Sequence, residues 1–449
     1  MKIVYFVHCF FPEHFYGSET YTLNVAKFLQ SVGHDVHIVT ARFPGEQKAK
    51  EFVSNYEYEG LSVTSFDKNV LPNTRIKDTY YQDDMRQPVR DIIEELQPDI
   101  VHVVHLINHT AVLLEVLQEL KIPVVATFTD FFGFCFNNKL QAADNKLCSG
   151  PSSSRVNCIA CFLKATSDKH TNSLLKKSVS TAPWVNISAE IINVVEKAIP
   201  SRLPHEYRSV IPDLKSRPDI LEACYQHYWA AIAPSKFLEK AYLANGFKKP
   251  LHLQNFGVDI DRAEKPNRGD EPLRVGYIGQ IAAHKGVDIL VEAFKRIENA
   301  KLVIYGPEDQ DKGYVSSLRK NAESCLSEVN FLGTFEPDRM ASIMRELDFI
   351  VIPSTWYENS PLVLLYALAT HTPAIVSDVE GMTEFVKDGE NGFVFPMGSA
   401  KNLAVILDEI SKDPIKARDI SANTSYLRST SDMADDVLRL YKEQLGVNA

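Results

Sequence analysis

With 449 residues, of which 45% are hydrophobic and 24% charged, the chain has the composition of a soluble globular protein with two or three domains. Its formal net charge of −10 argues against nucleic acid as the main partner, because phosphate binding requires a basic face. We therefore expect no nucleic-acid partner, although a local basic patch could still contact anionic lipid.

The first apolar run stops at His8, so it is too short for a signal peptide and far too short to span a bilayer. Seven cysteines, an odd number in a chain of this length, suit a reducing compartment better than a disulfide framework. We expect a cytoplasmic protein, with any membrane contact peripheral and at the inner face.

The first part of the chain alternates apolar, β-branched runs with stretches of helical periodicity. Strands are predicted at residues 2–7, 36–40, 100–104 and 124–128, and this alternation is typical of a doubly wound α/β sheet. The first helix is expected to start with Ser18 as its N-cap and to end at Gly33. In the turn before it, Gly17 allows the backbone to approach a phosphate or sugar closely, although most such turns only connect elements.

The regular pattern breaks between residues 129 and about 228, a segment that carries four of the seven cysteines. The pair Cys158-x-x-Cys161 has the tight spacing of zinc sites, and Cys135 and Cys148 lie upstream at irregular spacings. Four thiolates around a structural zinc would pin an insert that lacks a periodic core. Scattered thiols or a redox pair are the alternatives.

A helix is predicted within residues 187–199 of the same insert. Its apolar residues recur at helical spacing, and we expect them to face the core rather than a membrane. The residues are Ile191, Ile192, Val194, Val195 and Ile199.

A strand resumes at residues 230–234, and the first domain is expected to close near residue 259. The charged segment 262–271, which contains Pro266 and Gly269, is predicted to be a linker and a hinge. Beyond it, strands are predicted at 274–277, 302–305, 349–352 and 374–377, and helices near 287–296, 337–346 and 432–444. The second domain therefore alternates strands and helices, as the first domain does.

The stretch after residue 352 reads as a buried strand, a polar turn and a helix with Pro361 in its first turn. Free backbone N–H groups at residues 360–363, at the positive end of the helix dipole, favour an anion, and Glu358 beside them can bind sugar hydroxyls. Asn359, Ser360 and Leu362 are therefore candidate donor-binding residues. The alternative for Glu358 is an exposed loop position without function.

A second strand–turn–helix stretch contains Lys285, which can reach over a diphosphate held at a helix N-terminus or can simply be a surface lysine. Gln280 in the same turn can form hydrogen bonds but cannot neutralise charge. Gly306 and the turn at Thr334 follow further strands, where a nucleotide base and phosphate would rest.

Several motifs resemble those of the family-four retaining glycosyltransferases. They are Pro-Ser-x-x-Tyr-Glu-Asn-Ser-Pro-Leu-Val-Leu-Leu at 353–365, Pro-Ala-Ile-Val-Ser-Asp at 373–378, Asp-Gly-Glu-Asn-Gly-Phe at 388–393, Tyr-Ile-Gly-Gln-Ile-Ala-Ala-His-Lys-Gly at 277–286, Ala-Pro-Ser-Lys-Phe at 233–237, and Tyr-Gly-Ser-Glu at 16–19 with Gly-His-Asp-Val at 33–36. The resemblance covers most of the chain except about residues 130–227. It implies the GT-B fold, with two Rossmann-like halves facing each other across a cleft that binds a nucleotide sugar.

The resemblance also implies a domain plan and a mechanism. Residues 1–265 would form the acceptor-side domain, 272–428 the donor-binding domain, and 429–449 a helix that packs back on the first domain. Retaining transfer in this family is thought to need neither a protein nucleophile nor a metal, because the leaving phosphate accepts the proton of the acceptor. No cofactor is therefore expected for catalysis.

The resemblance assigns Lys285 to the diphosphate and Glu358 to the transferred sugar. The chain departs from the family where Gln280 replaces an arginine, Tyr366 a second glutamate and Thr129 a histidine. Tyr366 could bind a hydroxyl or pack in the core.

Asp130, next to Thr129, could take over hydrogen bonding to the sugar. His102, His105 and His109 cluster at the end of the preceding strand, where they could serve the acceptor or be structural. His105 and His109 are the candidate acceptor-side residues.

The expected function is retaining transfer from a nucleotide diphosphate sugar to a glycan or lipid-linked glycan in cell-surface polysaccharide or glycoconjugate synthesis. The first alternative is a catalytically degenerate homologue that acts as a binding or partner subunit. Isomerisation or hydrolysis of a sugar nucleotide on the same fold is a further alternative.

Overall fold

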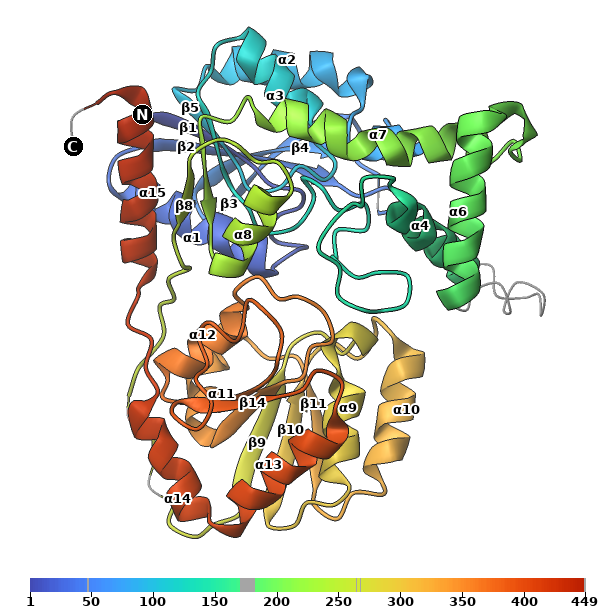
Figure 1. Cartoon of the computed structure of the whole chain (residues 1–449). Coiled ribbons are helices and arrows are strands. Elements are labelled where there is room, and N and C mark those ends of the chain that lie inside the picture. The colour runs from blue at the N-terminus through green and yellow to red at the C-terminus, as the bar shows by residue number, and fades with distance from the viewer. Residues whose placement is uncertain (47, 170–181, 264, 267, 448–449) are drawn as a thin grey trace. The chain divides into compact units, whose positions relative to one another are not determined.

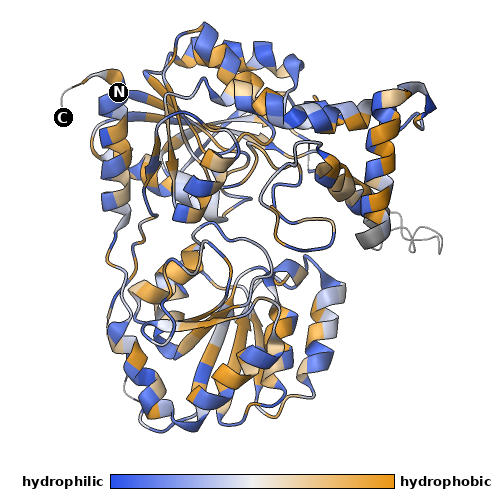
Figure 2. Ribbon diagram, in the orientation of Figure 1, coloured by the Kyte–Doolittle hydropathy of each residue, from blue (hydrophilic) through white to orange (hydrophobic). Residues whose placement is uncertain are grey.

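The computed structural model describes residues 1–46, 48–169, 182–263, 265–266 and 268–447. The chain divides into two compact units: unit 1 comprises Met1–Asn255 with Met433–Ala449, and unit 2 comprises Phe256–Asp432. Each unit is an α/β layer structure with apolar strands in its interior and helices that combine polar and apolar residues (Figures 1 and 2). The expected class of two Rossmann-like α/β units is therefore confirmed.

Unit 1 is built on one eight-stranded sheet in the order β3-β4-β2-β1-β5-β6-β7-β8. Apart from the antiparallel pair of β3 and β4, neighbouring strands are parallel. The strands are β1 (Lys2–Phe6), β2 (Asp35–Arg42), β3 (Val53–Tyr58), β4 (Leu61–Asp67), β5 (Ile100–Val103), β6 (Val124–Thr127), β7 (Ala230–Ala233) and β8 (Leu251–Leu253). The strands β5, β6 and β7 are buried along their whole length because helices cover both faces of the parallel sheet.

The helices of unit 1 fill the connections between these strands and build the insert after β6. They are α1 (Gly17–Ser31), α2 (Arg86–Leu96), α3 (Val112–Glu119), α4 (Val156–Lys169), α6 (Ala182–Ala198), α7 (Tyr207–Tyr225), α8 (Lys236–Ala244) and α15 (Thr430–Leu445). The helix α1 starts one residue before Ser18 and has Tyr16 as its N-cap. The expected capping by Ser18 is wrong, because its hydroxyl donates to Glu19 Oε1 instead.

The C-terminal helix α15 belongs to unit 1 from Met433 onward. Its buried Tyr441 hydroxyl lies 2.6 Å from the Tyr5 hydroxyl and 2.6 Å from Nδ1 of His102. The other ring nitrogen of His102 lies 2.9 Å from the Thr127 hydroxyl. His102 is therefore a structural residue that joins α15 to the central strands β1, β5 and β6.

Unit 2 contains a wholly parallel six-stranded sheet in the order β11-β10-β9-β12-β13-β14. The strands are β9 (Leu273–Ile278), β10 (Ala300–Tyr305), β11 (Val329–Gly333), β12 (Phe349–Ile352), β13 (Ala374–Ser377) and β14 (Gly392–Phe395). The helices are α9 (Val287–Phe294), α10 (Lys312–Ala322), α11 (Met340–Glu346), α12 (Leu362–Ala369), α13 (Ala400–Lys412) and α14 (Pro414–Asp419). Two apolar clusters, one on each face of the sheet, form its core.

The segment 262–271, expected to be the linker, is part of unit 2. Lys265 donates to the carbonyl of Met344 at 2.7 Å, and Arg268 forms a buried ion pair with Asp348. These bonds fix the charged segment to unit 2, so its polarity marks an anchored surface strip rather than a free connection. The chain instead passes between the units after Asn255.

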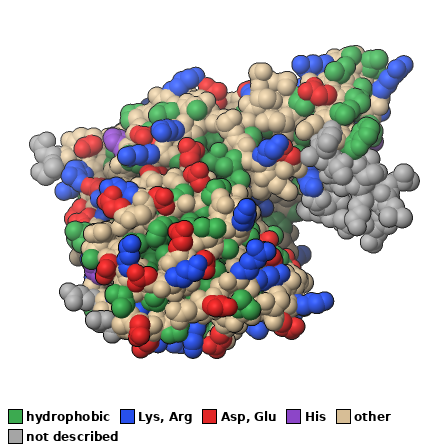
Figure 3. Space-filling view, turned by 60° about the horizontal axis from the view of Figure 1, so that its bottom comes forward, with side chains coloured by type: hydrophobic (Ala, Val, Ile, Leu, Met, Phe, Trp, Pro, Cys, Tyr) green, Lys and Arg blue, Asp and Glu red, His purple; other side chains and the backbone are tan. Residues whose placement is uncertain are grey.

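The helix α6 turns an apolar side outward, contrary to the expectation that it faces the core. Of the residues expected inside, Ile191, Val194 and Ile199 are 58%, 60% and 41% exposed. The buried positions are Val185, Ala189 and Asn193. Hydrophobic side chains accordingly gather at the upper right of the surface shown in Figure 3, where α6 lies. Helical periodicity identified the stripe, but the smaller residues beside it face the protein.

Candidate functional site

The strand order of unit 2 reverses between β9 and β12, the position where open α/β sheets bind ligands at their carboxyl ends. The loop after β9 contains residues 279–286, and the loop after β12 contains residues 353–361. Both loops therefore start at the same edge of the sheet, and they bring Lys285 and Glu358 together.

Glu358 is 7% exposed, and three donors converge on its Oε1 atom. They are Lys285 Nζ at 2.7 Å, Ser354 Oγ at 2.6 Å and Trp356 Nε1 at 3.1 Å. Burial by itself raises the pKa of Glu358, but the charge of Lys285 and these hydrogen bonds outweigh it and hold the pKa below its ordinary value. The carboxylate is therefore ionised and fixed in orientation.

Aromatic rings cover the charged pair. Lys285 Nζ lies 5.1 Å from the centroid of the Trp356 ring, and that ring lies 4.1 Å from the ring of His284. A cation above the face of an indole is attracted by its quadrupole, more strongly when water is excluded. Trp356 and Ser354 were not predicted as site residues, although both lie within four residues of Glu358.

A glycine holds the two loops against each other. Gly286 has φ = 71°, and a Cβ atom there would lie 2.0 Å from the carbonyl oxygen of Pro353. The backbone N–H of Thr355 also donates to the carbonyl of His284 at 2.9 Å. The loops after β9 and β12 thus contact each other through their backbones. Only glycine at residue 286 permits this close approach.

The turn before α12 is tightly built. Ser360 is 1% exposed with φ = 59°, a conformation that costs free energy in any residue except glycine. Leu362 is the first residue of α12, and Pro361 is its N-cap rather than a residue of the first turn. Asn359 precedes Ser360 in this turn. The predicted donor-binding residues therefore surround the N-terminus of α12.

The remaining donor-side candidates occupy different surroundings. The ring of Tyr366 packs against the apolar cluster around Leu364 and is partly buried, as the packing alternative predicts. Gln280 is partly buried after β9, and Gly306 follows β10, with its N–H bonded to the carbonyl of Gly333. Thr334 is exposed at the end of β11. All except Tyr366 lie at the carboxyl edge of the sheet.

Unit 1 has its own reversal of strand order, between β1 and β5. At the ends of β5 and β6, His105 Nε2 is in contact with Asp130 Oδ2. His105 Nδ1 accepts from the N–H of Ile107 at 3.1 Å, so the proton of a neutral ring lies on Nε2, toward Asp130. Burial raises the pKa of Asp130, but its interactions with His105 and its hydrogen bonds with Phe132 and Asn138 outweigh that rise, so the pKa lies below its ordinary value.

A second carboxylate beside this pair was missed from the sequence. Glu19 is fully buried, and its Oε1 accepts from Cys9 Sγ at 3.1 Å and Ser18 Oγ at 3.1 Å, with His8 Nε2 at 3.5 Å. Its Oε2 atom is buried and has no hydrogen-bond partner within the described part of the chain. The rings of His8 and His105 lie 4.2 Å apart, so they connect the two carboxylates. The only sequence signal was Glu19 in the Tyr-Gly-Ser-Glu motif.

Other residues predicted for this side are placed differently. His109 is fully buried, its Nε2 lies 2.8 Å from the carbonyl of Val7, and burial lowers its pKa to about 4, so its position is structural. Thr129 donates to the carbonyl of Val104 at 3.2 Å, beside Asp130. Gly17 is exposed at the start of α1, with open space where a Cβ would stand. His105 and Asp130 are thus brought together, whereas His109 is not part of the group.

Among the helices within the described residues, none is long and apolar enough to cross a membrane.

Two family profiles match the chain. The profile for glycosyl transferases group 1 matches residues 259–425, and the profile for glycosyltransferase family 4 matches residues 15–147. Together they cover most of both units outside the insert.

Curated relatives are similar over less than half of the chain. A phosphatidyl-myo-inositol mannosyltransferase of Mycobacterium leprae is 27% identical over 200 residues, which are 41% of this chain and 52% of the relative. A lipopolysaccharide 1,2-N-acetylglucosaminetransferase of Salmonella typhimurium is 25% identical over 46% of this chain and 54% of that protein. The chain thus spans about half the length of the curated relatives it matches.

Solved structures are similar in fold over the whole chain. A sucrose-phosphate synthase from Thermosynechococcus elongatus has a TM-score of 0.63 at 16% identity and covers 100% of both chains. The HepE protein of Anabaena, in complex with UDP and glucose, has a TM-score of 0.60 at 16% identity and covers 99% of this chain and 100% of its own. The fold of the two units is therefore the GT-B fold.

Proposed function

Given that this chain belongs to the glycosyl transferases of group 1, we propose that it transfers a sugar, with retention of configuration, from a nucleotide diphosphate sugar to a glycan or lipid-linked glycan. The observation that supports this most directly is the pair formed by partly buried Lys285 and buried Glu358 at the reversal of strand order in unit 2. A HepE structure in complex with UDP-glucose has a similar fold, which supports a nucleotide sugar as the donor.

The two charged residues of unit 2 suit different parts of such a donor. Lys285 would neutralise the diphosphate, which develops negative charge as its bond to the sugar breaks, and Glu358 would hold a hydroxyl of the sugar. The acceptor oxygen forms a bond to the anomeric carbon on the face that the diphosphate leaves, and the leaving phosphate takes the acceptor's proton. This route needs positioning and charge stabilisation, and it uses no protein nucleophile.

The acceptor is proposed to bind unit 1, near His105 and Asp130. The ionised carboxylate of Asp130 can accept a hydrogen bond from a sugar hydroxyl, and His105 fixes its orientation. Buried Glu19 supports the same group through His8. His8, His105 and Asp130 follow β1, β5 and β6, at the edge where such sheets bind ligands.

We place the protein at the cytoplasmic face of a membrane, in contact with it through the outward side of α6. Trp184, Ile187, Ile191 and Val194 are each at least half exposed and recur at helical spacing, which favours insertion at the level of lipid head groups. A lipid-linked acceptor would be presented at that surface, and the product would serve cell-surface polysaccharide or glycoconjugate synthesis.

A second candidate function, a degenerate partner subunit, is favoured by the position of Tyr366. This side chain packs with the apolar cluster of unit 2. Because it is a tyrosine in place of a second glutamate, it offers the donor no carboxylate. Gln280 likewise provides no positive charge for the diphosphate.

A panel of nucleoside diphosphates and their sugars separates the two candidates. A ligand that binds only the folded protein stabilises it by about 2.7 kcal/mol at a hundred times its dissociation constant, which raises the thermal midpoint. An enzyme should be stabilised by one base in the panel and should transfer sugar from the matching nucleotide sugar. Binding without transfer to any glycan acceptor supports the partner subunit, and the failure of every nucleotide at millimolar concentration overturns the transferase proposal.

A further inference from the structure

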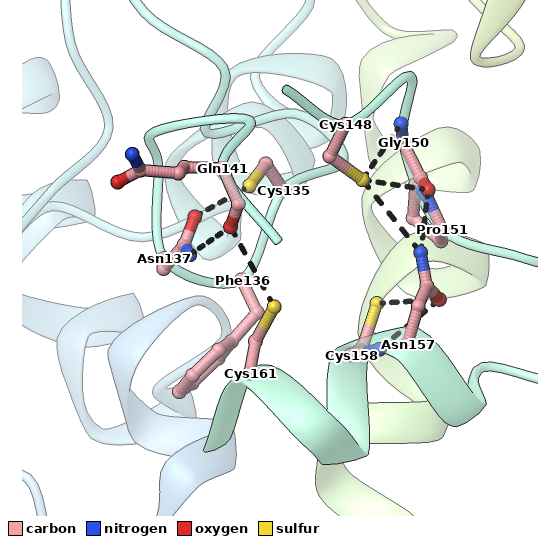
Figure 4. A pocket seen from close by; sticks show the side chains of 10 residues that line it. All are labelled: Cys135, Phe136, Asn137, Gln141, Cys148, Gly150, Pro151, Asn157, Cys158 and Cys161. Atoms are coloured by element: carbon pink, nitrogen blue, oxygen red, sulfur yellow. Dashed lines mark hydrogen bonds between the residues drawn. The ribbon is translucent and has the colours of Figure 1, made fainter. Parts of the chain in front are cut away.

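Four cysteines of the insert line one small cavity in unit 1. The cavity has a volume of about 20 Å³, room for a single water-sized sphere. Cys135 and Cys161 lie on one side of it, and Cys148 and Cys158 lie on the other, with their sulfur atoms directed inward (Figure 4). Residues up to 26 positions apart in the sequence are thus collected around one point, and all four are free thiols.

The local structure presents these thiols in pairs. Cys158 and Cys161 lie three residues apart near the start of α4, so they share one face of the helix, at the end where the dipole favours negative charge. Cys148 is held by the loop that follows it. Gly150 has φ = 126°, and a Cβ there would lie 2.1 Å from Asn245 Oδ1, so this loop is packed tightly against the end of α8.

Several N–H groups point at the sulfur atoms. The backbone N–H of Gly150 lies 3.4 Å from Cys148 Sγ, and Asn157 Nδ2 lies 3.7 Å from it. The backbone N–H groups of Leu140, Lys139 and Asn137 are directed at Cys135. Neutral thiols are weak acceptors, whereas thiolates bound to a metal are stabilised by such donors.

A buried cation lies in the same region without a carboxylate partner among the described residues. Arg217 is 3% exposed, its guanidinium lies 4.9 Å from the ring of Phe132, and its Nη2 donates to the Phe132 carbonyl, whereas its buried Nη1 atom has no hydrogen-bond partner among the described residues. Its charge acts on Cys135 and Cys158. An isolated buried charge is unfavourable, so a nearby anionic centre is expected to offset it.

We propose that Cys135, Cys148, Cys158 and Cys161 bind one zinc ion as a structural site. Four thiolates and Zn²⁺ carry a net charge of −2, which Arg217 and the N–H donors would partly offset, and binding releases the four thiol protons. Zinc–sulfur bonds of about 2.3 Å place the sulfurs of a tetrahedral site about 3.8 Å apart. Among the described residues, no three of these sulfurs lie within 4.8 Å of one another, so binding draws them inward.

The site also connects the insert to the acceptor side of unit 1. The N–H of Cys135 donates to the carbonyl of Phe131 at 2.8 Å, and Asn138 Oδ1 accepts from the N–H of Phe131 at 2.7 Å. Phe131 directly follows Asp130. A metal that fixes the loop around Cys135 therefore fixes the chain end that carries Asp130, and this inference does not depend on the proposed transferase activity.

Metal analysis of the full chain tests the proposal. The protein is purified without a histidine tag or chelator, under reducing conditions, and about one equivalent of zinc is expected because structural sites bind tightly. The double variant Cys158→Ser/Cys161→Ser should hold less than about a tenth of an equivalent. The variant Cys325→Ser, in unit 2, is the matched control and should keep its zinc. The variant Cys9→Ser should also keep it, because Cys9 lies with His8 and Glu19 in another group whose ligand atoms are within 4.8 Å of one another.

A second measurement on the wild-type protein covers the case in which the double variant does not fold. Replacement of zinc by Co²⁺ should produce the intense charge-transfer absorption of cobalt bound to thiolates, which a site of histidine and carboxylate cannot produce. Zinc below about a tenth of an equivalent in the wild type, or no thiolate band with cobalt, would overturn the proposal. So would iron with acid-labile sulfide in place of zinc, or zinc that is lost in Cys9→Ser and kept in the double variant.

Discussion

Lys285 Nζ lies 2.7 Å from Glu358 Oε1, although the two residues are 73 positions apart and follow different strands. Each residue neutralises the charge of the other. The carboxylate is almost fully buried, and the ammonium is its only cationic partner among the described residues. In the absence of a ligand the pair neutralises itself. A diphosphate would compete with Glu358 for Lys285, which would free the carboxylate for a sugar hydroxyl.

The variant Lys285→Ala is expected to lose sugar transfer. Removal of one preorganised donor to developing negative charge costs about 2.7–4 kcal/mol of transition-state stabilisation, a hundred- to a thousandfold in kcat/KM. Initial rates with a radiolabelled nucleotide sugar measure the change. Lys295→Ala removes a lysine of unit 2 that is paired with Glu292 and should leave the rate within about twofold. Equal rates for the two variants would remove Lys285 from the mechanism.

The variant Glu358→Gln should impair turnover far more than nucleotide affinity, because the proposed partner of the carboxylate is the sugar. We expect kcat to fall more than about tenfold while the dissociation constant of the nucleoside diphosphate changes less than about threefold. Calorimetry with the diphosphate and steady-state kinetics measure the two quantities. Glu380→Gln, at an exposed position of unit 2, is the control. A loss confined to nucleotide binding would place Glu358 on the nucleotide instead.

The variant Gly286→Ala tests the contact between the two loops of unit 2. Gly389 has nearly the same dihedral angle, φ = 73° against 71°, but has open space where a Cβ would stand. Gly389→Ala should therefore lower the free energy of unfolding by only about 1–2 kcal/mol, the cost of holding alanine in the left-handed conformation. Gly286→Ala must also move the Pro353 carbonyl and should cost about 1–3 kcal/mol more in the free energy of unfolding. Equal losses in denaturant titrations would contradict this close contact.

Acid should destabilise unit 1 through His102. Burial lowers the pKa of His102 to about 3, against an ordinary value of 6.5. Between these two values the unfolded state binds a proton that the folded state does not, so stability is unaffected above pH 6.5 and falls as the pH is lowered from there toward 3. The slope for one such group is up to about 1.4 kcal/mol per pH unit.

The variant His102→Gln should be less stable near neutral pH, because the bonds to Tyr441 and Thr127 are weakened, yet its stability should fall less steeply with acid. Denaturant titrations at several pH values compare the slopes. The exposed His205, replaced by glutamine, should keep the wild-type slope. Identical slopes for His102→Gln and the wild type would show that this histidine is not the titrating group.

The outward stripe of α6 is expected to bind vesicles. Burial of an isoleucine side chain contributes about 1.5–3 kcal/mol, so the partly inserted pair Ile187→Ser/Ile191→Ser should weaken partitioning to anionic vesicles about ten- to a hundredfold. Flotation assays measure the partitioning. Leu326→Ser/Leu427→Ser removes two apolar residues of unit 2 that are more exposed than this pair, and it should leave the partitioning unchanged. Equal partitioning of both double variants would rule out α6 as the contact.

The fold class was evident in the local pattern of the sequence. Strands such as β1, β5 and β12 are short, apolar and β-branched, and each leads into a helix, so local hydrophobic order was sufficient to predict parallel α/β units. The same pattern placed Lys285 and Glu358 in turns after buried strands. Strand order, by contrast, depends on pairing between distant segments, and it alone decided that these two turns are neighbours.

The parts that the sequence did not determine share one physical cause: periodicity shows which residues share a face, but not what covers that face. The stripe of α6 was identified correctly, yet only packing decided that Val185 and Ala189 face inward while Ile191 faces out. Glu19 is buried because His8 and Cys9 come from the end of β1, and His109 is enclosed by Phe6 and Phe66. Residue types and local order came from the sequence itself, and the burial and partners of each charged group were decided by the tertiary structure, because they depend on residues that only folding brings together.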